Sequence, residues 1–358
     1  MKRYLLIIVF IFFSFGCFAA DIVVVAPFSG GFSNYAIDML NGFKLALPAG
    51  ISLSKVDEFS KDFLSEVESC NPRIIIGPFM TENVDNLTEA FCNKPVVVIL
   101  PFARPRKSCF NVFYYGFNPI TAVHQLSQKI CQSPDSSIVV FYSMDKLSRK
   151  ERDVFLDEVK KCGALNVVDH PLPSFVNLYG NLIKDVFDIV KVGKISGLTE
   201  KKIFKQQFFP DKIIVFASAP SVVNLLSMLD YYDVKSGGVF VLTTKMSKDF
   251  ASLNLSAVEN VKIIIPYFIC NKARLNVNFV DQYRKTYGDD PSQFSALGFD
   301  IGNLLLETFA GKNLKDIKDE QLVLGRLMFF DDSNRAVLDY PILNAKEVRL
   351  CTKQILSR

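Results

Sequence analysis

The chain has 358 residues, of which 49% are hydrophobic and 22% are charged. These proportions are typical of a globular chain of about two domains, and they exclude a disordered or fibrous protein. The formal net charge of +4 is small for this length and the basic residues are scattered, so the sequence predicts no nucleic-acid partner.

The first 20 residues have the pattern of a secretory signal peptide. Lys2 and Arg3 precede an apolar run over residues 4–13, and small residues follow. The run is too short for a membrane span of about 20 residues. We therefore expect an exported, periplasmic protein that is released in soluble form, with a lipid anchor at Cys17 as the alternative.

Seven cysteines lie beyond the predicted signal peptide, and none belongs to a C-x-x-C motif, so the sequence predicts neither a zinc ribbon nor a thioredoxin-type redox site. Export permits disulfides, and an odd number leaves at least one thiol unpaired or bonded elsewhere. We expect separate buried thiols with at most one bridge. The seven are Cys70, Cys92, Cys109, Cys131, Cys162, Cys270 and Cys351.

The first mature segment predicts a strand followed at once by a helix. Residues 22–26 are five consecutive apolar residues, as in a strand buried on both faces of a parallel sheet. Ser33 is placed to cap the helix, and Phe32 and Ile37 have the spacing of a hydrophobic staple.

The loop between this strand and helix contains Ser29 and Gly30. Loops that leave the carboxyl end of a strand for a helix amino terminus bind small ligands in open α/β sheets, because free N–H groups point there. The loop is therefore a candidate binding site. An ordinary glycine turn is the alternative.

Strands and helices alternate along the rest of the chain, which predicts parallel sheets with right-handed crossovers. The expected strands cover residues 51–53, 73–77, 95–100, 136–142, 165–168, 211–217, 238–242 and 261–266. The expected helices cover residues 59–69, 81–91, 119–131, 148–162, 175–190, 220–232, 275–287 and 292–309. Residues 191–202 read as a polar surface loop, and residues 325–330 and 337–343 as a hairpin.

Several motifs follow one another in the order of a known family. They are Pro27-x-Ser29-Gly30 with Asn41-Gly42, then IIIGPFMTENV, KPVVVILPF and YGDDPSQFSALGFDIGNLL. Over residues 21–350 the chain resembles the type I periplasmic binding proteins, the family of leucine/isoleucine/valine-binding receptors.

The resemblance implies an α/β fold of two Rossmann-like lobes, with parallel sheets and a hinge of three crossovers. The lobes would be residues 21–120 plus 245–323 and residues 121–244 plus 324–358. The strand at residues 261–266 would return to the first sheet, and a ligand would lie between the lobes.

In receptors of this family, the turns after the third and fourth strands hold the ligand carboxylate. By resemblance, the candidate ligand-binding residues here are Ser29, Gly30, Phe79, Met80, Thr81, Phe102, Ala103, Arg104, Ser218 and Thr243. Thr81 keeps a hydroxyl, but the second turn lacks its Ser/Thr pair and the acid that holds an ammonium group is missing near Thr243. Arg104 would instead face an anion, unless it is a solvated surface arginine.

Residues for catalysis are scarce. The chain has two histidines, His124 and His170, which we interpret as ordinary polar packing, and it has no G-x-S-x-G elbow or phosphate-binding loop motif. We expect no enzyme, no cofactor and no metal site.

The sequence therefore favours a non-catalytic exported solute-binding protein, a receptor for an ABC importer of amino acids or related small molecules. Its partners would be an amino acid-like or anionic ligand and a membrane ABC permease. The alternative comes from PFARP at residues 101–105 and from residues 225–244, which also resemble penicillin-binding-protein activators. Such a protein would regulate peptidoglycan synthesis through contacts with a peptidoglycan synthase.

Overall fold

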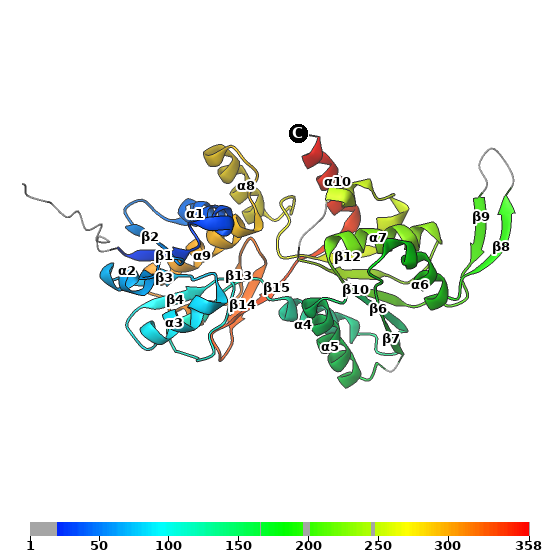
Figure 1. Cartoon of the computed structure of the whole chain (residues 1–358), viewed down its shortest axis with the longest axis horizontal. Helices are drawn as coiled ribbons and strands as arrows, with labels where there is room; N and C mark the ends of the chain where they lie inside the picture. The colour runs from blue at the N-terminus through cyan, green and yellow to red at the C-terminus, as the bar shows by residue number, and fades with distance from the viewer. Residues whose placement is uncertain (1–19, 165, 196–200, 245–247, 358) are drawn as a thin grey trace, which may run out of the picture. The chain divides into compact units, whose positions relative to one another are not determined.

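The computed structural model describes residues 20–164, 166–195, 201–244 and 248–357 (Figure 1). Nearly all of the expected signal peptide, Cys17 included, lies outside the described residues. The chain divides into two compact units. Of the described residues, one comprises those up to Leu40 with Leu47–Gly116 and Asp332–Arg335, and the other comprises those of Asn41–Ala46, Phe117–Asp331 and from Ala336 onward.

The first unit is built on a five-stranded parallel sheet of order β2-β1-β3-β4-β5. Every residue of β1 is buried, as the apolar run predicts. The strands are β1 (Ile22–Ala26), β2 (Leu53–Asp57), β3 (Ile74–Ile76), β4 (Val97–Leu100) and β5 (Val112–Tyr114). Helices α2 (Phe63–Ser69) and α3 (Thr81–Phe91) connect consecutive strands and pack their buried side chains into one apolar cluster with the sheet.

Helix α1 (Ser33–Ala46) begins differently from the prediction. A 3-10 turn, Gly30–Phe32, precedes it, so Phe32 is the cap residue and no side chain caps the helix. The predicted staple is also wrong, because Phe32 and Ile37 are 51% and 45% exposed. The predicted apolar face is confirmed at Ala36, Met39, Leu40 and Phe43, which are all buried.

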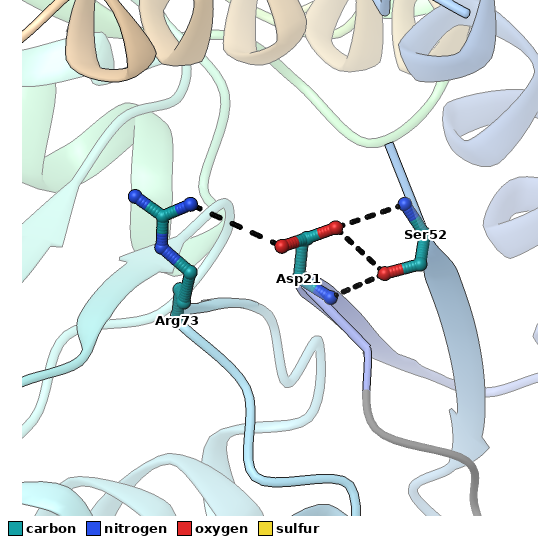
Figure 2. A network of polar contacts seen from close by, with 3 residues as sticks. All are labelled: Asp21, Ser52 and Arg73. Atoms are coloured by element: carbon teal, nitrogen blue, oxygen red, sulfur yellow. Dashed lines mark hydrogen bonds and ion pairs between the residues drawn. The ribbon is translucent and has the colours of Figure 1, made fainter. Parts of the chain in front are cut away.

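The amino ends of three neighbouring strands are tied together by Asp21 (Figure 2). Its carboxylate accepts hydrogen bonds from the backbone N–H and the hydroxyl of Ser52, at 3.1 and 2.7 Å. Arg73 lies 3.9 Å from the other carboxylate oxygen. The bonds from Ser52 hold the pKa of Asp21 below its ordinary value. This network stabilises the edge of the sheet opposite to the candidate binding loops.

The second unit contains a six-stranded sheet of order β16-β12-β11-β10-β6-β7, parallel except for β16. Its strands are β6 (Ile138–Tyr142), β7 (Val167–Pro171), β10 (Lys212–Phe216), β11 (Val239–Leu242), β12 (Val261–Ile264) and β16 (Ile342–Asn344). Its helices are α4 (Pro119–Ile130), α5 (Lys146–Lys161), α6 (Tyr179–Val186), α7 (Ala219–Tyr231), α8 (Arg274–Tyr287), α9 (Gln293–Phe309) and α10 (Ala345–Leu356). The expected hairpin forms within the small sheet of β13 (Glu320–Gln321), β14 (Arg326–Phe330) and β15 (Ala336–Asp339).

Two expectations are wrong in this unit. Strand β12 does not return to the first sheet but pairs in parallel with β11 of the second. The predicted polar loop at residues 191–202 is in its described part an antiparallel hairpin of β8 (Val190–Ile195) and β9 (Lys201–Lys205). The lobe boundaries inferred from the family resemblance therefore stay a proposal.

Two motif residues, Gly42 and Asp300, have structural contacts. A Cβ atom on Gly42 would lie 1.8 Å from the carbonyl oxygen of Ser295 in α9, so the close approach of α1 to α9 requires glycine. The buried Asp300 accepts hydrogen bonds from the backbone N–H groups of Val323 and Leu324 at 2.7 and 2.9 Å. These motifs position the backbone.

Disulfides correct the expectation of separate thiols: Cys70 is disulfide-bonded, and three further bridges have both cysteines among the described residues. Cys92 pairs with Cys109, Cys131 with Cys162, and Cys270 with Cys351, and no free cysteine occurs in the part of the chain that the structure describes. The partners are 17 to 81 residues apart in the sequence. Their pairing therefore depends on how the chain folds and is not visible in local spacing.

Candidate functional site

The candidate site lies in the first unit, at the edge where its parallel strands end. The loop with Ser29 and Gly30 follows β1, residues 77–80 follow β3, and residues 101–111 follow β4. Because β1, β3 and β4 are neighbours in register, the structure brings these three predicted loops to one edge of one sheet. Ser29 and Thr81 are exposed there, and Ala103 is buried.

A buried acid that the sequence analysis missed joins the segment after β2 to the loop after β3. Glu58 directly follows β2 and is 2% exposed. Its Oε2 atom accepts hydrogen bonds from the backbone N–H groups of Phe79 and Met80 at 3.1 and 3.0 Å, and the Asn83 side chain donates to its backbone carbonyl at 3.0 Å. The backbone donors of two predicted ligand-binding residues are therefore occupied by the protein's own carboxylate.

Glu58 also acts on the helix that follows. Met80 is the cap residue of α3 and makes no side-chain capping bond, so the Glu58 carboxylate supplies the negative charge that a helix amino terminus favours. Its second oxygen, Oε1, is buried without a hydrogen-bond partner among the described residues. Burial raises the pKa of Glu58, and the N–H groups of Met80, Asn83 and Phe79 oppose this rise.

Aromatic side chains lie in the loops at this edge. The rings of Phe79 and Phe102 meet edge to face with centroids 4.6 Å apart, which joins the loops after β3 and β4. Phe59 is 49% exposed and lies against Gly30, because a Cβ atom added to Gly30 would be 3.7 Å from the Phe59 ring. Gly30 has a φ of +74°, a conformation that glycine adopts readily. Phe59 and Phe102 are therefore aromatic groups at this edge that remain partly exposed.

The Arg104 guanidinium contacts an aromatic ring. The guanidinium lies over the Tyr114 ring, 5.3 Å from the centroid, and both residues line a cavity of about 230 Å³ within the first unit. The same cavity is lined by Arg335, which the sequence analysis also missed. No local signal could have found Arg335, because it lies 231 residues from Arg104 in the sequence.

Ser218 and Thr243 belong to the second unit, where they follow the neighbouring strands β10 and β11. Ser218 is exposed at the start of α7, and its hydroxyl lies 3.1 Å from that of Ser221. Thr243 is buried, and its backbone N–H donates to the carbonyl of Ile264 at 3.2 Å. A ligand-binding role for these two residues stays a proposal.

The titratable residues elsewhere have structural contacts. His124 of α4 pairs with Glu158 of α5. His170 lies in β7 beside the Phe141 ring, and burial lowers its pKa. Burial raises the pKa of Glu151 in α5 to about 8, and Asp145 adds to this rise. Among the described residues, no group of three or more His, Cys, Asp or Glu side chains is arranged to hold a metal ion.

The chain has the fold of type I periplasmic binding proteins. A putative branched-chain amino acid ABC transporter protein from Rhodospirillum rubrum superposes with a TM-score of 0.71 at 15% identity, over 90% of this chain and 100% of that chain. The carboxyl-terminal domain of LpoA from Haemophilus influenzae, a regulator of PBP1A, superposes with a TM-score of 0.63 at 14% identity. The superposition covers 89% of this chain and 95% of that chain. Against longer LpoA, the TM-score is 0.66 at 15% identity and the chain spans 57% of that protein.

No protein-family model and no curated protein sequence matches the chain. The similarity to these solved structures therefore establishes the fold, a mixed α/β architecture with parallel-strand sheets. Within the residues that the structure describes, no helix has both the length and the apolar character needed to cross a membrane.

Proposed function

We propose that this chain is an exported, non-catalytic solute-binding protein that serves as receptor for an ABC importer. The observation that carries the proposal is the cluster of loops at the carboxyl edge of the first sheet, where Ser29, Phe102 and Arg104 lie on exposed loops and Thr81 is exposed at the start of α3. Ligands of open α/β sheets bind at this edge. The three disulfides suit an oxidising compartment outside the cytoplasm.

The ligand proposed is a small molecule other than a free α-amino acid. Glu58 already occupies the N–H groups of Phe79 and Met80, so a ligand carboxylate has no access to them. A second carboxylate beside the buried Glu58 would also be repelled. An amino acid would need other donors for its carboxylate and an acid for its ammonium group.

Thermal unfolding of the mature chain, residues 21–358, tests this function. The panel consists of leucine, small dicarboxylates, nucleobases and peptidoglycan fragments. A ligand at 100 times its Kd should stabilise the protein by about 2.7 kcal/mol, which raises Tm by a few degrees. We expect a concentration-dependent shift with one class of compound but not with leucine. If no compound shifts Tm, the receptor proposal is wrong.

A second candidate function is that of an envelope protein that regulates a peptidoglycan synthase. The specific observation in its favour is again Glu58, because a site closed by the protein's own carboxylate need not hold a ligand. The fold likeness to LpoA is compatible with it. Adding the purified chain to a peptidoglycan synthase from the same cells tests it: faster glycan polymerisation supports this function, and an unchanged rate contradicts it.

A further inference from the structure

The cavity beside Arg104 is bounded by segments that are far apart in the sequence. The loop between β4 and β5 contributes Arg104 and Ser108, the end of β5 contributes Tyr114, and the turn between β14 and β15 contributes Ser333 and Arg335. All of these residues belong to the first unit. The cavity is therefore a feature of one compact unit.

Asn334 fixes the turn that carries Arg335. Its side-chain amide donates to the carbonyl oxygens of Cys109, Phe110 and Val112 at 3.0 to 3.1 Å, and it is 4% exposed. The backbone carbonyl of Asn334 accepts a hydrogen bond from the Tyr114 N–H at 2.9 Å. Asn334 adopts φ +55°, a left-handed conformation in which asparagine is among the favoured residues. The residues on either side of it, Ser333 and Arg335, are thereby held at the cavity.

A disulfide fixes the loop that carries Arg104 and Ser108. Cys109 lines the cavity and is bonded to Cys92, which immediately follows α3. The loop of residues 101–111 is thus held by the disulfide and by Asn334. A binding site needs walls that keep their geometry, because ordering them on binding would reduce the affinity.

The side chains that line the cavity have one sign of charge. Arg104 and Arg335 supply two guanidinium groups, while Ser108, Ser333 and Tyr114 supply hydroxyls. None of the described residues that line it is acidic. The Tyr114 ring supports the Arg104 guanidinium by a cation–π contact. Guanidinium groups bind carboxylates and phosphates through paired hydrogen bonds.

We propose that this cavity is an anion-binding site that takes a small molecule bearing carboxylate or phosphate groups, with Arg104 and Arg335 as its principal contacts. A volume of about 230 Å³ exceeds the roughly 30 Å³ that one water molecule occupies, so a small organic anion fits. Because the described lining residues include no acid, they offer no partner to an ammonium group of the ligand. The inference rests on the proposed binding function, because it names the class of the ligand.

Isothermal titration calorimetry on the mature chain tests the site. The probes are succinate and inorganic phosphate, which distinguish a carboxylate from a phosphate ligand, with succinamide as the neutral control. The variants are Arg104→Ala, which removes one guanidinium, and Ser108→Asp, which keeps both arginines and adds a negative charge. Arg106→Ala is the matched control, because Arg106 lies in the same loop, is 94% exposed and pairs with Asp85 outside the cavity.

We expect one of the two anions to bind the wild-type protein, with at least a tenfold loss of affinity in Arg104→Ala and Ser108→Asp and no loss in Arg106→Ala. The proposal is overturned if neither anion binds, or if Arg104→Ala binds as tightly as the wild type. Should a compound of another class bind wild type and Arg104→Ala alike, the receptor function stands and the anion site falls. If no compound of the wider panel binds, the receptor function falls as well.

Discussion

The Glu58 Oε2 atom lies 3.0 Å from the backbone nitrogen of Met80. An acid at the end of β2 therefore satisfies the cap residue of α3, across a separation of 22 residues in the sequence. This contact fixes the loop after β3 and takes up donors that a ligand carboxylate would otherwise use. The Glu58 contact therefore affects both the stability of the first unit and the class of ligand that the unit can bind.

Replacing Glu58 by alanine should destabilise the protein by about 1–3 kcal/mol, because the N–H groups of Phe79 and Met80 lose their acceptor. Urea unfolding measures the loss. Formate should restore part of the stability of Glu58→Ala, since its carboxylate fits the vacated place, whereas formamide and chloride should not. Equal effects of formate on the variant and on the wild type would contradict this role for Glu58.

The contact between α1 and α9 depends on glycine at position 42. In Gly42→Ala the added Cβ would lie 1.8 Å from the Ser295 carbonyl oxygen, so the helices must separate, and we expect a loss of about 3 kcal/mol or more. Gly31→Ala is the control, because nothing lies within 4 Å of its added Cβ. Calorimetric Tm values should fall for the first variant alone. Similar Tm values for both would refute the close packing.

Asp300 should prove structural. In Asp300→Ala, the backbone N–H groups of Val323 and Leu324 remain buried without their acceptor, and we expect a loss of about 2–4 kcal/mol. Asp281→Ala, at an exposed position of α8, should change stability by less than about 0.5 kcal/mol. Denaturant midpoints compare the two variants. A midpoint of Asp300→Ala close to that of Asp281→Ala would show that these hydrogen bonds contribute little.

Glu151 should make stability fall as pH rises. Burial raises its pKa from 4.5 to about 8 in the folded protein, so the folded state holds a proton that the unfolded state releases between these values. The contribution of Glu151 to the free energy of unfolding is complete below about pH 4.5 and is lost towards pH 8. In this range the free energy of unfolding falls by at most about 1.4 kcal/mol per pH unit.

Glu151→Gln has no proton to lose at this position. Relative to the wild type, it should therefore become more stable as pH rises from 5 to 8, whereas Glu82→Gln, at an exposed position, should follow the wild type. Unfolding free energies at pH 5, 6.5 and 8 test the difference. Parallel curves for wild type and Glu151→Gln would mean that the pKa of Glu151 is not raised.

Local patterns predicted the elements whose residues are close in sequence. The apolar run of β1, the helix at Thr81–Phe91 and the break before α9 all depend on neighbours within one element or turn. The cap at Ser33 was wrong because a 3-10 turn starts three residues earlier. A one-turn difference of this kind depends on how the preceding loop packs.

Long-range pairing could not be predicted in this way. The residues of β12 are apolar enough for either sheet, so their composition does not say which one they join. Glu58 follows Asp57 in a polar segment, and nothing in that segment shows that it is buried. Arg335 reaches the Arg104 cavity through the hydrogen bonds of Asn334 to a loop more than 220 residues away. Arg104 alone was a candidate, because its place after a strand end is visible in the sequence.

Arginine side-chain NMR tests the central claim most directly. The mature chain is labelled with ¹⁵N-arginine and titrated separately with succinate, inorganic phosphate and leucine, while the Nε–Hε signals of Arg104, Arg335 and Arg106 are followed. We predict that one of the two anions shifts the signals of Arg104 and Arg335, that Arg106 is unaffected, and that leucine shifts none of the three. Shifts of Arg104 and Arg335 with leucine, or no shift with either anion, would contradict a first unit that binds anions and rejects α-amino acids.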